Sequence, residues 1–265
     1  MTHPWRRYVA LGDSFTEGLE DRAPDGSVRG WADRLAQHLA DRCGEEVSYA
    51  NLAIRGRLLA PIVAEQLEPA LALKPDLVSL IAGGNDTLRP AVDPDALAAR
   101  LEDAVARLRA SGATVLLGTS VDTRDAGRLL SMNRRALGIF NSNLYAIAAR
   151  HGAHVMNLWG MRSLRDWQVW APDRIHLNPE GHERVSQAAL VALGLEPDRP
   201  DWDEPLVPLP LRSRRERWES DLTWSREYLA PWLTRRIRRT STGRHRVAKL
   251  PQYRTVNPAR HEATG

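Results

Sequence analysis

The stretch "RYVALGDS" (residues 7–14) runs from an unbroken apolar segment into a sharp turn that carries one serine. A continuous apolar run that ends at glycine is typical of a strand buried on both faces of a sheet. Four later stretches have the same character: "EVSYANLA" (46–53), "DLVSLIAGGND" (76–86), "ATVLLGTS" (113–120) and "AHVMNLW" (153–159). The sequence therefore predicts five strands.

Helical patterns separate these strands. Apolar residues recur at helical spacing or between helix start and stop signals in five stretches: 30–44, 58–74, 93–112, 131–152 and 178–194. Asp93 and Asn178 each stand before a proline, as an N-cap residue stands before the first helical position. Strands that alternate with helices predict a parallel sheet with right-handed crossovers, in a three-layer α/β/α domain.

In such sheets, ligands bind outside the carboxyl ends of the strands. The residues that follow the strands are Ser14 after the first, Gly56 after the second and Asn85 after the third. Asp173 and His176 lie in the long loop after the fifth strand. We expect all of these residues to face one crevice.

These residue types suit attack on an acyl carbon, which needs a nucleophile, a base, a group that orients the base, and donors for an oxyanion. Ser14 can be the nucleophile and His176 the base, since the imidazole exchanges protons near neutrality. Asp173, three residues earlier, can accept a hydrogen bond from the imidazole and fix its tautomer. Gly56 offers a backbone N–H, and Asn85 offers a side-chain amide.

The four motifs together resemble the four blocks of the SGNH (GDSL-type) hydrolase superfamily. They are Gly-Asp-Ser after the first strand, glycine after the second, Gly-x-Asn-Asp after the third, and Asp-x-x-His before the last helix. The namesake residues of that family would be Ser14, Gly56, Asn85 and His176. Phe15, where many members have leucine, and "HLNPEGH" (176–182), in place of the commoner His-Pro, are small departures.

The resemblance implies a flavodoxin-like sandwich with a five-stranded parallel sheet over residues 1–195. It also implies a metal-independent, cofactor-free esterase, lipase, thioesterase or related acylhydrolase acting on a small-molecule ester or thioester. Ser14 would attack, His176 would be the base and Asp173 would orient it. The oxyanion hole would comprise the N–H groups of Ser14 and Gly56 and the amide of Asn85.

Two other functions stay open at this stage. One is a catalytically silent module that binds a ligand in the crevice and docks through its tail. The other is a metallophosphoesterase, which would need clustered histidines and an Asp-x-His motif that the sequence lacks. His182 is expected to be a packing histidine and not a metal ligand, and Asp13 and Asp86 are expected to hold loops beneath the site.

Three tryptophans, Trp159, Trp167 and Trp170, flank the loop that leads to Asp173. They could clamp this loop to the sheet, or one of them could line an acyl or alcohol pocket. The sequence favours neither interpretation.

Composition indicates a globular protein, with 43% hydrophobic and 26% charged residues. A single cysteine, Cys43, excludes an internal disulfide and any multi-cysteine metal site. The N-terminus lacks the apolar segment of a signal peptide, and no stretch approaches the roughly 20 apolar residues of a membrane span. We therefore expect a cytoplasmic protein with no transmembrane segment.

The charge is concentrated at the C-terminus. Residues 212–265 hold 14 Arg and Lys against 5 Asp and Glu, whereas the remainder carries a net charge of −5. We expect a proline-rich linker over 196–212 and a basic, tryptophan-rich arm over 213–265, disordered from about residue 248. The arm could lie on the acidic domain or contact an anionic surface or partner through 213–247. Nucleic acid binding is the least favoured interpretation, because no binding motif accompanies the charge.

Overall fold

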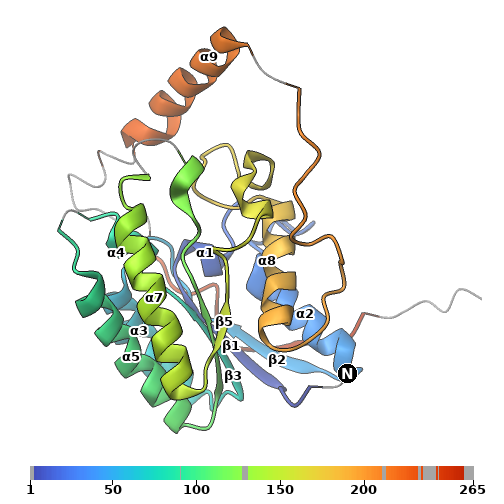
Figure 1. Ribbon diagram of the computed structural model, residues 1–265. Coiled ribbons are helices and arrows are strands. Elements are labelled where there is room, and N and C mark those ends of the chain that lie inside the picture. The colour runs from blue at the N-terminus through green and yellow to red at the C-terminus, as the bar shows by residue number, and fades with distance from the viewer. Residues whose placement is uncertain are drawn as a thin grey trace, which may run out of the picture.

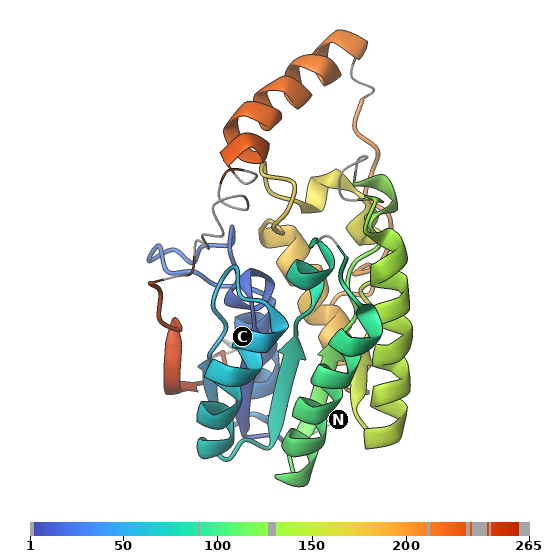
Figure 2. The same ribbon diagram turned by 90° about the vertical axis from the view of Figure 1, so that its left-hand side faces the viewer.

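The computed structural model describes residues 3–89, 91–126, 131–210, 213–231, 234, 243 and 245–259 (Figures 1 and 2). Within these residues one sheet has the strand order β5-β4-β3-β1-β2-β6. The strands are β1 (Arg7–Gly12), β2 (Val47–Asn51), β3 (Leu77–Ile81), β4 (Thr114–Gly118), β5 (His154–Met156) and β6 (Leu250–Val256). The longer helices are α2 (Trp31–Cys43), α3 (Leu59–Ala72), α5 (Pro94–Ala110), α7 (Arg134–His151), α8 (Pro179–Ala192) and α9 (Arg214–Trp224).

Strands β1 to β5 are parallel, and their order is that of a flavodoxin-like fold. Helices α2 and α8 cover one face of the sheet, and α3, α5 and α7 cover the other (Figure 1). Each face has its own buried apolar cluster, because the strand side chains alternate between the two helical layers. The predicted three-layer α/β/α sandwich with five parallel strands is confirmed.

The sheet differs from the prediction in one respect. Strand β6 pairs antiparallel with β2, so the sheet is mixed and has six strands in the described residues. Residues 250–256, which we expected to be disordered, form this strand. β6 covers the outer edge of β2, which would otherwise present unpaired backbone groups.

Lys249 anchors the start of β6. Its ammonium donates to the carbonyl oxygens of Glu17 and Val28, at 2.7 and 3.1 Å, and lies 2.6 Å from a carboxylate oxygen of Asp33. Burial raises the pKa of Asp33, while the nearby Lys249 charge opposes this effect. The buried carboxylate therefore has its counter-ion in the C-terminal segment.

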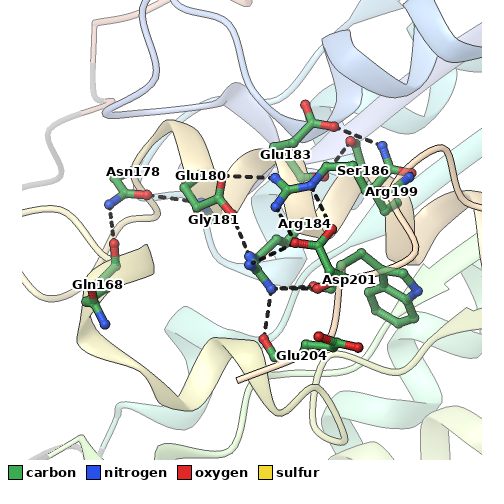
Figure 3. Close-up of polar contacts among 12 residues, drawn as sticks. Gln168, Asn178, Glu180, Gly181, Glu183, Arg184, Ser186, Arg199, Asp201 and Glu204 are labelled. Atoms are coloured by element: carbon green, nitrogen blue, oxygen red, sulfur yellow. Dashed lines mark hydrogen bonds and ion pairs between the residues drawn. The ribbon is translucent and has the colours of Figure 1, made fainter. Parts of the chain in front are cut away.

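The segment that follows α8 lies against that helix. Arg184 of α8 is buried and donates to the backbone carbonyls of Asp201, Trp202 and Glu204, each at 3.0 Å (Figure 3). It also pairs with Glu180, one helical turn earlier, at 2.7 Å. One guanidinium thus satisfies three carbonyls of an irregular segment.

Candidate active site

Two of the predicted site residues follow neighbouring strands at the centre of the sheet. Ser14 begins the short helix α1 (Ser14–Glu17) directly after β1, and Asn85 lies in α4 (Gly84–Thr87) after β3. β1 and β3 pair with each other, and the strand order reverses at this point of a flavodoxin-like sheet. Crevices form at such switch points because successive crossovers leave on opposite faces.

Gly12 makes the sharp exit from β1 possible. Its φ is +151°, and a Cβ there would lie 2.6 Å from the carbonyl oxygen of Ile81. The buried side chain of Gln66, from α3, accepts from the Gly12 N–H and donates to its carbonyl, both at 2.9 Å. Only glycine fits this position, and Gln66 satisfies the two backbone groups that turn away from the strand.

Ser14, His176 and Asp173 form one hydrogen-bonded chain. The His176 Nε2 atom lies 3.0 Å from Ser14 Oγ, and Nδ1 lies 2.5 Å from Asp173 Oδ2. A carboxylate can only accept a hydrogen bond, so Nδ1 carries the proton and Nε2 is free to accept from the serine hydroxyl. The structure thus brings together the nucleophile, base and orienting carboxylate that the sequence predicts.

The backbone of its own loop also holds Asp173. Its Oδ1 accepts from the N–H groups of Ile175 and His176, both at 3.0 Å. Burial alone would raise the pKa of Asp173, but the His176 ring and these N–H groups hold it below its ordinary value. Asp173 is therefore a carboxylate whose two oxygens both have donors.

Asn85 and Asp13 lie side by side. The Asn85 amide donates to Asp13 Oδ2 at 2.9 Å and to the carbonyl of Arg57 at 3.1 Å. The other oxygen of Asp13 accepts from the Phe15 N–H at 3.0 Å and caps α1. Burial raises the pKa of Asp13 to about 6, with the Phe15 N–H opposing the shift. Asp13 holds the loops around Ser14 and Asn85, as expected.

Asp86, the neighbour of Asn85, also holds a loop. Its Oδ2 accepts from the Leu59 N–H at 2.9 Å, at the start of α3. Burial raises the pKa of Asp86, and the Leu59 N–H opposes the shift.

Gly56 lies in the turn after β2, with a left-handed φ of +71°. On one side of it, Arg55 forms an ion pair with Glu17 of α1 and donates its backbone N–H to the same carboxylate at 2.7 Å. On the other side, the Arg57 carbonyl accepts from Asn85. These contacts tie the turn to the loops that carry Ser14 and Asn85. Gly56 itself is not among the described residues that line the cavity below.

A cavity of about 200 Å³ opens beside the serine, and Ser14, Asn85 and His176 all line it. Much of its wall is apolar, with contributions from Phe15, Ile81, Ala82, Val121, Leu137, Leu158, Leu164, Trp167, Trp170 and Ile175. Arg165, Arg174, Asp122 and Asp125 also line it. An apolar chain fits such a wall, with its polar end toward Ser14.

The sequence left open whether the three tryptophans clamp the loop or line a pocket, and the structure shows both roles. Trp167 and Trp170 line the cavity, and Trp170 also donates its indole N–H to the carbonyl of Leu164 at 3.0 Å. Trp159 packs against Arg134, whose guanidinium carbon lies 5.3 Å from the centroid of the Trp159 ring. Trp159 is not among the described residues that line the cavity. Trp170 therefore both clamps the loop and forms pocket wall.

His182 is a packing residue. Its Nδ1 accepts from the Trp31 N–H at 3.2 Å and its Nε2 donates to the Leu19 carbonyl at 2.9 Å. Burial lowers the pKa of His182 to about 4, so the ring is neutral. Both ring nitrogens are occupied, and the described residues contain no group of three or more His, Cys, Asp or Glu side chains arranged to hold a metal ion.

A hydrogen-bonded chain of serine, imidazole and carboxylate is the arrangement of an ester hydrolase, and here it lies at the carboxyl edge of a flavodoxin-like sheet. The sequence pattern of the GDSL-like lipase/acylhydrolase family matches residues 10–184. The chain belongs to this family, which confirms the resemblance and makes the protein an SGNH-type esterase or acylhydrolase.

Solved structures agree with this assignment. TesA is 27% identical, with a TM-score of 0.58, and the match covers 71% of this chain and 97% of TesA. LAE5, an alpha/beta hydrolase enzyme from the metagenome of Lake Arreo, is 25% identical, with a TM-score of 0.59 and coverage of 71% and 94%. No curated protein matches the sequence.

A variant of Axe2, an acetyl xylan esterase from Geobacillus stearothermophilus, shares the fold. It is 22% identical, with a TM-score of 0.60 and coverage of 73% of this chain and 97% of Axe2. The family match ends before α9 and β6, so the C-terminal arm lies outside it. Within the described residues, no helix combines the length and apolar character needed to cross a membrane.

Sequence reasoning missed the residues that support the site from a distance. Gln66, the Glu17–Arg55 pair and the Arg57 carbonyl act on the reactive loops from other elements. Their residue types are common, and they meet the site through contacts across 28 or more positions. Gln66 stands between Glu65 and Glu68 in its helical stretch, so no signal in the sequence set it apart.

Proposed function

We propose that the protein cleaves a carboxylic ester or thioester through an acyl-Ser14 intermediate. The observation that carries the proposal is the hydrogen-bonded chain from Ser14 Oγ through His176 to Asp173. A serine hydroxyl needs a base to react with an acyl carbon, and this arrangement supplies one with its tautomer fixed.

In the first half-reaction, Ser14 Oγ attacks the carbonyl carbon while its proton moves to His176 Nε2. Asp173 stabilises the imidazolium that forms and keeps the ring in place. When the tetrahedral intermediate collapses, the bond to the leaving oxygen or sulfur breaks, and His176 returns the proton to it. The alcohol or thiol then departs and the acyl group remains on Ser14.

The oxyanion of the intermediate would be bound by the N–H groups of Ser14 and Gly56 and by the Asn85 amide. Both amide hydrogens of Asn85 have partners within the protein, Asp13 and the Arg57 carbonyl. The bond to the Asp13 carboxylate is the stronger kind when that group is ionised. We infer that the hydrogen facing the Arg57 carbonyl is the one shared with the oxyanion.

In the second half-reaction, a water molecule loses its proton to His176 and attacks the acyl carbon. The bond from that carbon to Ser14 Oγ then breaks, His176 returns the proton to Oγ, and the acid leaves. Every group in this scheme belongs to the chain or to water, so we propose that no metal or cofactor takes part. The occupied ring nitrogens of His182 support this view over a metallophosphoesterase.

The size of the cavity supports a short or medium acyl chain. Pockets for drug-sized ligands measure roughly 300–1,000 Å³, whereas the cavity beside Ser14 measures about 200 Å³. The substrate would place its acyl chain against the apolar wall and its leaving group toward the solvent.

We also propose that the protein works in the cytoplasm, which is a reducing compartment. Cys43, the one cysteine of the sequence, is a free, half-buried thiol. Fractionation of expressing cells followed by immunoblotting tests this placement, and recovery outside the cytoplasm would overturn it.

Replacement of Ser14 tests the proposed function. Ser14→Ala should reduce hydrolysis of p-nitrophenyl acetate to the rate of the uncatalysed reaction, with an unchanged circular dichroism spectrum. Ser142→Ala is the matched control, because Ser142 lies on the exposed side of α7 and bonds only its own helix, at Gly138. Full activity of the Ser14 variant would refute the acyl-serine mechanism.

A further inference from the structure

The loop that carries Asp173 and His176 is held partly by hydrogen bonds within itself. The Ala171 N–H donates to the His176 carbonyl at 2.8 Å, and the Arg174 N–H donates to the Ala171 carbonyl at 2.9 Å. Asn178, just beyond the loop, donates to the Gln168 carbonyl at 2.7 Å (Figure 3). The carbonyl of Asp173 and the side chain of Arg174 instead bond outside the loop.

Both of these groups are bound by the C-terminal end of α9. The Trp224 indole N–H donates to the Asp173 carbonyl at 2.8 Å. The Arg174 guanidinium bonds Asp221 at 2.7 Å and Ser220 at 3.2 Å. It also lies over the Trp224 ring, 5.1 Å from the centroid. Figure 2 shows this end of α9 (orange) beside the loop that precedes α8 (yellow).

Arg174 has a conformation that calls for such support. Its φ is +59°, in the left-handed region, where a residue with a Cβ is strained. The peptide that joins Asp173 to Arg174 is held within the loop at its N–H, by the Ala171 carbonyl, and from outside the loop at its carbonyl. Trp224 binds its carbonyl, and Asp221 binds the side chain that follows it.

Helix α9 has a capping box that favours its start at Ser213. Ser213 and Glu216 make a reciprocal capping box at its start, with bonds of 3.2 and 2.7 Å. A helix of this length is marginal alone in water, so its position depends on tertiary contacts. Its polar contacts with the catalytic domain include those with Asp173 and Arg174.

We propose that Trp224 and Asp221 are positioning residues for the reaction, and that they act by fixing the Asp173–Arg174 peptide and thereby the carboxylate that orients His176. This inference rests on the proposed function and goes beyond it, because α9 lies outside the family match and touches no reacting atom. Loss of these contacts lets the peptide rotate, which moves the Asp173 carboxylate relative to the His176 ring. The chemical step slows as a result, whereas most of the wall of the acyl pocket comes from other elements.

The test uses the full-length protein and four variants. Trp224→Phe keeps the ring over Arg174 but removes the N–H, and Asp221→Ala combined with Ser220→Ala removes both polar partners of the guanidinium. Trp218→Phe and Glu219→Gln are the matched controls on the same helix. Trp218 is 65% exposed, and Glu219 pairs with Arg215 within α9. For each variant, kcat, KM and the melting temperature are measured with p-nitrophenyl butyrate.

The low-field proton resonance of the His176 Nδ1–H, which bonds Asp173, is recorded as well, because it reports the geometry of that bond without any turnover. We expect Trp224→Phe to lower kcat by about three- to tenfold, the effect of one lost hydrogen bond. KM should stay within about twofold, and the resonance should move upfield or broaden. The double variant should do the same to a smaller extent, since Asp221 is exposed, and both controls should match the wild type.

Three results would overturn the proposal. One is an unchanged kcat and resonance in Trp224→Phe and in the double variant, and another is equal losses in the controls. The third is a change confined to KM, which would mean that α9 shapes the pocket. If the wild type hydrolyses no ester, the proposed function fails, while the resonance still tests whether α9 positions Asp173.

Discussion

The side-chain amide of Asn85 donates a hydrogen bond of 2.9 Å to Asp13, a residue 72 positions earlier in the chain. The bond joins the loops that follow β1 and β3, the two strands between which the site opens. It places a buried carboxylate, Asp13, directly behind the amide that we assign to the oxyanion hole. Two predictions follow from this pair.

The first concerns stability against pH. Burial raises the pKa of Asp13 to about 6, from an ordinary value of 3.8. Between these values the Asp13 carboxyl keeps its proton in the folded protein but has lost it in the unfolded chain. The contribution of Asp13 to the free energy of unfolding therefore falls as the pH rises from about 4 to 6. Asp13→Asn removes this contribution. Urea unfolding at several pH values should show the wild type losing up to about 3 kcal/mol relative to the variant across that window. Parallel curves for the two proteins would contradict the assignment.

The second concerns the amide. Asn85→Ala should lower kcat by about 10²–10³-fold, as the loss of an oxyanion donor does in other acyl-transfer enzymes, with a smaller change in KM. Steady-state kinetics with p-nitrophenyl esters measure this. Asn143→Ala is the control, because Asn143 of α7 is half-buried, bonds Asp95 and is not among the described residues that line the cavity. A kcat within threefold of the wild type would remove Asn85 from the oxyanion hole.

The preferred acyl-chain length should depend on the size of the side chains in the pocket wall. Leu137→Ala enlarges the cavity, so the ester with the highest kcat/KM should shift to a longer acyl chain in a series from acetate to decanoate. Leu144→Ala is the control: Leu144 is also buried on α7, two turns along, but is not among the described lining residues. Both variants should lose about 2–5 kcal/mol of stability. Identical chain-length profiles in both would show that the acyl chain binds elsewhere.

The anchoring of β6 can be tested through the lysines, of which the sequence has two, Lys74 and Lys249. Lys249→Met leaves the Asp33 carboxylate without its counter-ion and should destabilise the protein by about 3–5 kcal/mol. Lys74→Met, at an exposed position, should change stability by less than about 0.5 kcal/mol. Chemical denaturation measures both. Equal, small effects would mean that Lys249 is not an anchor.

The central strands could be predicted because they are buried on both faces, which leaves continuous apolar runs in the sequence. β6 left no such signal. Its residues, Leu250–Val256, include a proline and are mostly exposed, since the strand lies at the edge of the sheet. Pairing with β2 and the contacts of Lys249 fix it, and neither is a local property of the sequence.

The meeting of Ser14, Asp173 and His176 could be predicted for a similar reason. Asp173 and His176 are three residues apart, and Ser14 follows an unmistakable strand, so each motif is local even though the site is not. The supporting residues are different, because Gln66 and Trp224 reach the site from elements 54 and 51 positions away from their partners. Only the folded chain shows those contacts.

The central claim is that Ser14 carries the acyl group, and covalent trapping tests it most directly. The protein is incubated with a p-nitrophenyl alkylphosphonate, which a nucleophilic serine attacks at phosphorus with release of p-nitrophenol, and is then digested and analysed by mass spectrometry. We predict one adduct per chain, on the peptide that contains Ser14, formed in step with loss of esterase activity and absent from Ser14→Ala. Inactivation with the adduct on another residue, or undiminished activity in a chain fully labelled at Ser14, would contradict the account.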